Sequence, residues 1–204
     1  MPKKTSNNYK HLLNFLGLPS RPVLTGFHVK PDGTIEATNS HVILRLLKRS
    51  TLGVDITIDP KSLEELQEGK YPDTDRFFNH LQPSTTIAFT GKDYEEMFKF
   101  AKQFRVKAPE TLELRYSYND DRTTLRAGNG ASLDLEAEVT GSEGSILVSS
   151  TYLRYVCDFL RDNLDAGQEC DCQIVGDLRP IRFTDRNTFD MILMPIRKPK
   201  SRWD

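Results

Sequence analysis

The sequence lacks long hydrophobic runs and has few cysteines, and each of these absences excludes a class of protein. No apolar stretch approaches the roughly 20 residues of a membrane-spanning helix. The first ten residues, MPKKTSNNYK, contain no hydrophobic core of a signal peptide. Three cysteines, an odd number without the spacing of a disulfide framework, fit a reducing compartment. We therefore expect a cytoplasmic protein with no membrane partner.

Motifs of catalysis and of metal binding are also missing. The chain contains no P-loop, no G-x-G-x-x-G, no G-x-S-x-G and no H-E-x-x-H. Cys170 and Cys172 alternate along a predicted strand, but a metal would need two further ligands nearby, so packing in the core is favoured. Asp120 and Asp121 fall in a predicted hairpin turn, where Asp is common for backbone reasons. We expect a protein that is not an enzyme and that holds neither metal nor cofactor.

The formal net charge is -1, from 28 Lys+Arg and 29 Asp+Glu, so the overall charge does not indicate a partner. The charge is unevenly distributed, because the first ten residues carry three lysines and no acid. The last eight residues carry four cations and one acid. Two interpretations remain open for these ends: solvated tails that keep the protein soluble, or an electrostatic footprint for nucleic acid.

Hydrophobic periodicity predicts an α+β protein that divides near residues 80–86, where Pro83 and several Ser/Thr residues interrupt the pattern. The apolar run at 191–194 is expected to be part of a strand covered on both faces. Before the division we expect helices at 8–18 and 60–69, and strands at 22–30, 34–47 and 53–59. After it we expect helices at 91–106 and 150–164, and strands at 85–90, 111–118, 123–128, 131–141, 144–150, 169–176, 179–185 and 189–197.

The two long predicted helices each present cations on the face opposite their apolar stripe. Lys92, Lys99 and Lys102 are seven and three residues apart and project together. Arg154 and Arg161 likewise share one face. A solvated surface explains such spacing, and a surface that follows DNA phosphates without reading sequence also explains it.

Five segments, in the correct order, together carry a resemblance to a known family. They are RPVLTGFHVKPDGTIEATNSHVILR (21–45), PKSLEEL (60–66), EGKYPDTDRF (68–77), SILVSSTYLRYVCDFL (145–160) and ILMPIR (192–197). They resemble the middle and C-terminal domains of the bacterial DNA polymerase III β sliding clamp. The resemblance implies two clamp-type domains in which helices pack on antiparallel sheets: a shortened one over 1–83 and a complete one over 84–204.

Two departures from the family pattern stand out. The family's first domain has no counterpart, and between PKSLEEL and EGKYPD the rest of a helix and about two strands are missing. In addition, the family's Thr-Asp-Gly-His-Arg reads Thr-Asn-Ser-His-Val at 38–42. The cation is thereby replaced by Val42, which favours an altered peptide preference.

The resemblance implies a non-catalytic protein that encircles or sits on duplex DNA and tethers replication or repair proteins. Family rings contain six domains, so a two-domain chain is expected to form a trimer, associated with the nucleoid. The DNA-facing residues would be Lys92, Lys99, Lys102, Arg154 and Arg161. The groove for clamp-binding peptides would comprise Leu24, Thr38, Ser40, His41, Ile43, Pro83, Ile192, Leu193, Met194, Pro195, Ile196 and Arg197.

Two alternatives stay open. The groove residues would also suit an ordinary interface between the two halves of the chain. The protein as a whole would also suit an interaction module that forms no ring and that binds clamp-binding peptides or a host clamp to modulate replication.

Overall fold

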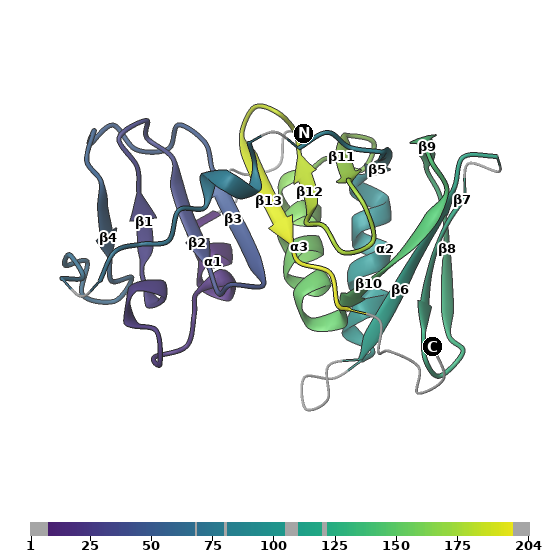
Figure 1. Cartoon of the computed structure of the whole chain (residues 1–204), viewed down its shortest axis with the longest axis horizontal. Coiled ribbons are helices and arrows are strands. Elements are labelled where there is room, and N and C mark those ends of the chain that lie inside the picture. Colours follow the sequence, from purple (N-terminus) through teal and green to yellow (C-terminus); the bar gives the residue numbers. More distant parts are fainter. Residues whose placement is uncertain (1–7, 68, 80, 105–109, 120–121, 198–204) are drawn as a thin grey trace.

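The computed structural model describes residues 8–67, 69–79, 81–104, 110–119 and 122–197 (Figure 1). The helices are α1 (Asn8–Leu12), α2 (Gly91–Lys102) and α3 (Ser150–Asn163), with 3-10 turns η1 (Leu13–Phe15), η2 (Pro22–Thr25) and η3 (Asp75–Phe77). The strands are β1 (Phe27–Val29), β2 (Ile35–Thr38), β3 (Val42–Leu46), β4 (Ile56–Ile58), β5 (Thr85–Thr90), β6 (Thr111–Ser117), β7 (Arg122–Ala127), β8 (Ser132–Glu136), β9 (Glu138–Gly141), β10 (Gly144–Ser149), β11 (Glu169–Ile174), β12 (Ile181–Thr184) and β13 (Phe189–Leu193). The predicted α+β class is confirmed.

A nine-stranded antiparallel sheet runs the length of the molecule in the order β4-β1-β2-β3-β13-β12-β11-β5-β9 (Figure 1). The two halves of the chain meet inside this sheet, because β3 pairs with β13 from Phe189↔Leu46 to Leu193↔Val42. All five residues of β13 are buried, so the strand is covered on both faces, as its unbroken apolar run predicts. The main hydrophobic core includes residues from both halves, Leu12 and Leu44 as well as Met97 and Leu160. The division at 83/84 stays a prediction about domains, because the sheet and core are continuous across it.

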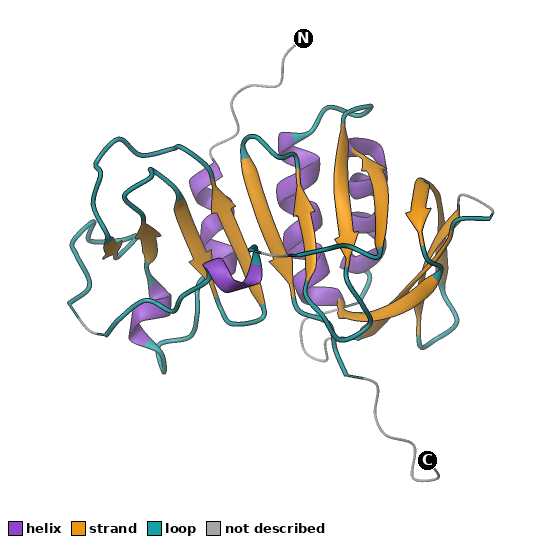
Figure 2. Ribbon diagram, turned by 45° about the horizontal axis from the view of Figure 1, so that its top comes forward, coloured by secondary structure: helices purple, strands orange, loops and turns teal. Residues whose placement is uncertain are grey.

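Helices α2 and α3 lie side by side and contact strands of the large sheet and of the second sheet, whose order is β10-β6-β7-β8 (Figure 2). A capping box starts α2: the Thr90 side chain accepts a hydrogen bond from the Asp93 backbone N–H, and the Asp93 carboxylate accepts one from the Thr90 N–H. The residues that the periodicity places on the apolar stripes are buried: Tyr94, Met97, Ala101, Phe104, Leu153, Val156, Cys157, Leu160 and Leu164.

The predicted helix at 60–69 is wrong. The Asp59 carboxylate accepts hydrogen bonds from the N–H groups of Lys61 and Ser62, which forms a turn in place of a first helical turn. Leu63 then takes a positive φ of 60°, and Glu65 forms a bridge to Ile58 along the outer edge of β4. The turn was misread because Pro60 and the following acids are also typical of a helix start.

Three predicted strands differ from the structure. The strand expected at 34–47 is two strands, β2 and β3, separated by a tight turn at 39–41. The start of the strand expected at 22–30 is the 3-10 turn η2. The strand expected at 131–141 divides at Ala137, so that β8 joins the small sheet and β9 the large one.

Several predictions fall outside the described residues: the end of the helix at 105–106, the turn residues Asp120 and Asp121, and most of the two basic ends (1–7 and 198–204). Over the described ranges, no helix is long and apolar enough to cross a membrane.

Candidate functional site

The turn between β2 and β3 is built by its own side chains. The Asn39 carboxamide oxygen accepts hydrogen bonds from the N–H groups of His41 (3.0 Å) and Val42 (3.1 Å). The Thr38 hydroxyl donates to the Val42 carbonyl at 2.7 Å and accepts from the Ser40 N–H at 3.1 Å. Ser40 adopts a φ of 78°, which a non-glycine residue takes only when its surroundings hold it there. The turn therefore presents Thr38 and Ser40 in a fixed geometry at the end of the sheet.

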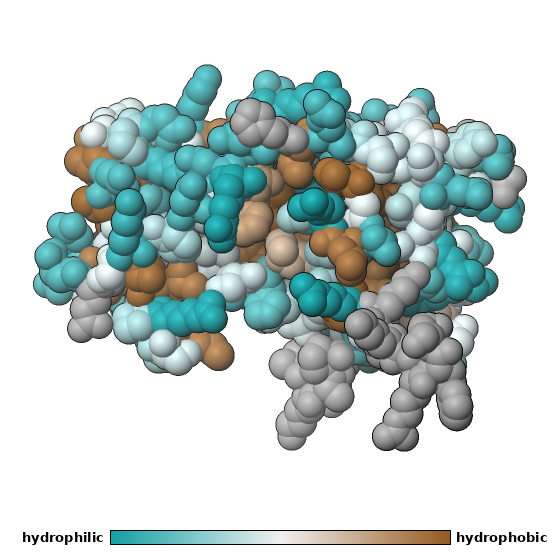
Figure 3. Space-filling model, in the orientation of Figure 1, coloured by the Kyte–Doolittle hydropathy of each residue, from teal (hydrophilic) through white to brown (hydrophobic). Residues whose placement is uncertain are grey.

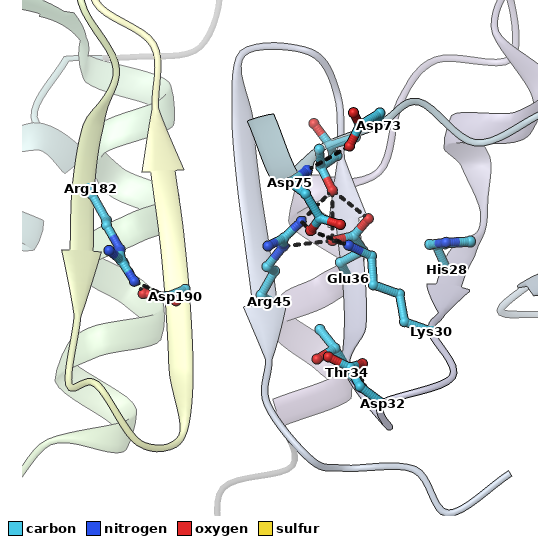
Figure 4. Close-up of polar contacts among 12 residues, drawn as sticks. His28, Lys30, Asp32, Thr34, Glu36, Arg45, Asp73, Asp75, Arg182 and Asp190 are labelled. Atoms are coloured by element: carbon cyan, nitrogen blue, oxygen red, sulfur yellow. Dashed lines mark hydrogen bonds and ion pairs between the residues drawn. The ribbon is translucent and has the colours of Figure 1, made fainter. Parts of the chain in front are cut away.

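A charged cluster holds residues 70–78, the connector that crosses the sheet face opposite the helices, against β2 and β3 (Figure 4). Arg45 Nε donates to Glu36 Oε2 at 2.7 Å, and Arg45 Nη2 donates to Thr74 Oγ1 and Asp75 Oδ1, each at 2.6 Å. The Thr74 hydroxyl donates to Glu36 Oε1 at 2.7 Å, and Lys30 Nζ lies 2.6 Å from Asp75 Oδ1. The hydrogen bond from the Lys30 ammonium holds the pKa of Asp75 below its usual value; desolvation opposes this effect, and the Arg45 guanidinium adds to it. Since Glu36 is fully buried, this network contributes to the fold and is not a set of solvent-exposed ion pairs.

A small apolar cluster continues the contact between connector and sheet. Its buried members are Ile43, Phe78 and Ile192, with Phe77, Leu81 and Met194 packed partly buried around them. The Arg45 guanidinium lies 3.8 Å from the centre of the Phe78 ring, which links the charged cluster to the apolar one. The connector is thus fixed as a wall above the ends of β3 and β13.

This wall, the β2–β3 turn and η2 enclose a pocket of about 560 Å³. Five predicted groove residues line it: Leu24, Thr38, Ser40, Ile43 and Met194. Its surface is mainly apolar with a few hydroxyl groups, the composition expected of a site for a small ligand or a peptide side chain. Figure 3 shows hydrophobic residues (brown) exposed among hydrophilic ones (teal) in the middle of the face seen in Figure 1.

The other predicted groove residues surround the pocket without lining it. Ile192 and Leu193 are buried in the sheet, and exposed His41 stacks on Tyr152 with ring centres 5.1 Å apart. The chain then leaves β13 along the junction, where Met194 N–H donates to the His41 carbonyl at 2.8 Å and Ile196 N–H to the Leu147 carbonyl at 2.7 Å. The remaining three are half-buried Pro195 and exposed Pro83 and Arg197.

Further residues of the wall, and residues in or next to η2, line the same pocket and were not predicted from the sequence: Arg21, Val23, Lys70, Pro72, Thr74, Arg76 and Phe77. A signal was present, because RPVL and KYPDTDRF lie within the matched segments. The contact of 70–77 with β2 and β3 depends on a pairing of residues about 30 apart, Arg45 with Thr74 and Asp75, which spacing does not reveal.

The five predicted DNA-facing cations lie on α2 and α3, where acids accompany them. Lys99 Nζ lies 3.2 Å from Glu95 Oε1, and Arg161 bridges both helices by contacting Glu95 at 3.2 Å and Asp158 at 2.7 Å. Lys92 lies 3.9 Å from Glu96, Lys102 is 5.8 Å from the Phe98 ring centre, and Arg154 is 5.5 Å from that of Tyr155. Three lysines face three acids on α2, and two arginines face two acids on α3, so each helix is formally neutral.

The described residues offer little for covalent or metal chemistry. Burial raises the pKa of the Cys170 thiol to about 12 and those of Cys157 and Cys172 still further, so all three remain protonated thiols at neutral pH. No group of three or more His, Cys, Asp or Glu side chains able to hold a metal ion occurs over the described ranges. The apolar pocket, with polar groups at its edge, is suited to binding a small ligand or a peptide side chain.

The fold is that of the DNA sliding clamps. The chain superposes on solved structures of DNA polymerase III β subunits over almost its whole length. The Bacillus subtilis sliding clamp matches with a TM-score of 0.76 and 18% identity over 94% of this chain, and the Thermotoga maritima β subunit with 0.73 and 13% over 94%. The Bartonella birtlesii clamp, solved bound to griselimycin, matches with 0.72 and 16% over 93%.

The chain spans 62% of the B. subtilis clamp and 64% of each of the other two. No family model and no curated protein matches the sequence. The comparisons therefore confirm the predicted sliding-clamp fold at low sequence identity.

Proposed function

We propose that this chain is a non-catalytic, clamp-type tethering protein that binds short peptide segments of partner proteins. The observation that carries the proposal is the pocket between η2, the β2–β3 turn, the connector and Met194. An extended peptide would place one or two large apolar side chains over Leu24, Ile43 and Met194, and the Ser40 hydroxyl, which accepts a hydrogen bond from Arg21, would donate to its backbone. Sliding-clamp structures support this assignment by their fold.

The pocket's size implies modest affinity. Burying one large apolar side chain contributes about 1.5–3 kcal/mol, and ordering a peptide offsets part of that gain. Two anchors therefore predict dissociation constants in the micromolar range or weaker. Such affinity suffices for tethering, because a partner held near its substrate acts at a raised effective concentration without any chemistry in the tether.

A matched pair of substitutions tests the pocket. Met194→Lys places a charge on the pocket floor, and Leu178→Lys places the same charge at an exposed leucine on the turn before β12. Selection from a displayed peptide library against the native chain, followed by fluorescence anisotropy, should yield peptides whose binding falls at least tenfold with Met194→Lys and is unchanged with Leu178→Lys. Peptides that respond equally to both variants, or a library that yields no binder, would overturn the proposal.

A second candidate function is association with duplex DNA in a trimeric ring. The fold and the exposed lysines of α2 favour it, since the Lys92 and Lys99 side chains are 73% and 67% exposed. The formal neutrality of both helices favours the alternative, a module that forms no ring. In a ring, the mass by light scattering is three times that of one chain, and Lys92→Glu with Lys99→Glu abolishes retention on closed circular DNA. A monomeric mass together with no retention on closed circular DNA would favour the module that forms no ring.

A further inference from the structure

The pocket's rim is positively charged. Three cations line it, Arg21, Lys70 and Arg76, and all three are exposed. No Asp or Glu is among the described residues that line it. Because the whole chain has a formal charge of -1, a rim with three cations and no acid shows that charge is unevenly distributed over the surface.

Two nearby cations, Arg45 and Lys30, differ from the rim cations because they form ion pairs within the protein. Arg45 and Lys30 reach Glu36 and Asp75 at 2.6–3.5 Å, so their charges are compensated within the fold. The three rim cations form no ion pair with a carboxylate over the described ranges. The polar pocket on the other side of the connector is lined by several acids, including Asp55 and Asp73. Lys70 lines both pockets, whereas Arg21 and Arg76 line the apolar pocket and not the acidic one.

The local geometry holds two of these cations at the pocket. Arg21 Nη1 donates to the Ser40 hydroxyl at 2.7 Å, which uses one of the five N–H groups of the guanidinium and leaves the others for a ligand. The Arg76 guanidinium lies 4.7 Å from the centre of the Phe77 ring, another residue of the pocket wall. Ser40 and Phe77 thus fix the guanidinium groups beside the apolar floor and reduce the entropy lost when a carboxylate binds.

We propose that the pocket selects acidic peptides: an apolar anchor enters over Leu24 and Met194 while flanking carboxylates pair with Arg21, Lys70 and Arg76. This inference rests on the proposed peptide-binding function and names the chemistry of its partner. Exposed charge pairs of this kind change affinity by about 1.4- to 5-fold each and fall with ionic strength. Three of them acting together discriminate an acidic from a neutral flank by roughly tenfold at low salt. Basic flanks are rejected, because they face like charges.

Three synthetic decapeptides test the selection. They share two central leucines and carry glutamate, glutamine or lysine at the four flanking positions, and anisotropy measures their dissociation constants at about 20 mM and 300 mM salt. The expected order of affinity is glutamate, glutamine, lysine, with the difference shrinking at the higher salt. Equal affinities for the glutamate and glutamine peptides that both respond to Met194→Lys would overturn the acidic selection and leave peptide binding intact. Absence of binding by all three would count against both.

Charge-reversal variants assign the effect to the rim. Lys70→Glu combined with Arg76→Glu should remove the preference for the glutamate peptide while leaving the glutamine peptide within about twofold of its native affinity. Arg179→Glu, at an exposed arginine outside the pocket, is the matched control and should leave the preference unchanged. Arg179→Glu changes the net charge by half as much as the double variant. If it reduces the preference by about half as much on a logarithmic scale, the selection arises from overall charge and the proposed rim is wrong.

Discussion

Arg45 is the residue whose loss tests the charged cluster most sharply. It is 7% exposed and donates to Glu36, Thr74 and Asp75. Arg45→Met keeps most of the volume and the contact with Phe78 but removes the charge. Glu36, with no exposed surface, then retains only the Thr74 hydroxyl and Lys30 Nζ at 3.5 Å.

The expected magnitude follows from that burial. Removing one partner of a buried ion pair costs about 3–5 kcal/mol when the other charge is left unpaired. Lys30 Nζ stays 3.5 Å from Glu36, so the expected cost lies at the lower end of that range. The contact with Asp75 adds little, since that side chain is 53% exposed and solvent screens it. We therefore expect the free energy of unfolding to fall by about 3 kcal/mol, a large part of the 5–15 kcal/mol typical of folded domains.

Urea denaturation followed by far-ultraviolet circular dichroism measures this loss. Arg186→Met is the matched control, because the Arg186 side chain is 73% exposed in its pair with Asp171 and its removal should cost less than about 1 kcal/mol. Replacing both buried partners, Glu36→Leu with Arg45→Met, should cost less than Arg45→Met alone. A loss for Arg45→Met no greater than for Arg186→Met would show that the buried pair with Glu36 does not stabilise the fold.

Three further predictions concern other parts of the fold. Thr90→Ala removes the side chain that caps α2 and should lower the free energy of unfolding by about 1 kcal/mol, seen as a drop of about 2–4 °C in Tm, whereas Thr90→Ser should retain most of it. With burial raising the pKa of Cys170 to about 12, the described cysteines should react with a thiol reagent at pH 8 only after unfolding; immediate reaction of the native protein would contradict this. Burial holds the pKa of His11 below its unfolded value, so its neutral form contributes stability above about pH 6.5 that is lost as the pH falls through the lower folded value. His11→Leu should therefore flatten the fall in stability between pH 7 and pH 5, and an unchanged slope would exclude His11 as its source.

The sequence predicted those helices and strands that are determined by the order of apolar and polar residues within the segment itself. Helices α2 and α3 follow directly from their apolar periodicity, and the β6–β7 hairpin from two alternating runs around a turn. The turn at 39–41 was missed because apolar residues continue on both sides of it. Only the hydrogen bonds of Asn39 and the positive φ of Ser40 show that the chain reverses there.

The pocket illustrates what local patterns do not contain. Leu24, Ile43 and Met194 were expected in one groove because of the family resemblance, and the structure brings them together. The wall opposite them depends on long-range contacts, Arg45 with Thr74 and the packing of Phe78 on Ile192. A buried Glu–Arg pair on adjacent strands reads in sequence as ordinary surface charge, so the cluster that supports the wall was not foreseen.

Methyl NMR of the methionines shows whether the pocket beside Met194 receives an acidic peptide. The chain has four methionines, of which Met97 and Met191 are buried in the core and Met194 lines the pocket. Titrating the ¹³C-methyl-labelled protein with the glutamate decapeptide should shift the Met194 resonance to saturation while those of Met97 and Met191 stay in place. A Met194 resonance that does not move while the peptide is in large excess would show that the peptide does not enter this pocket.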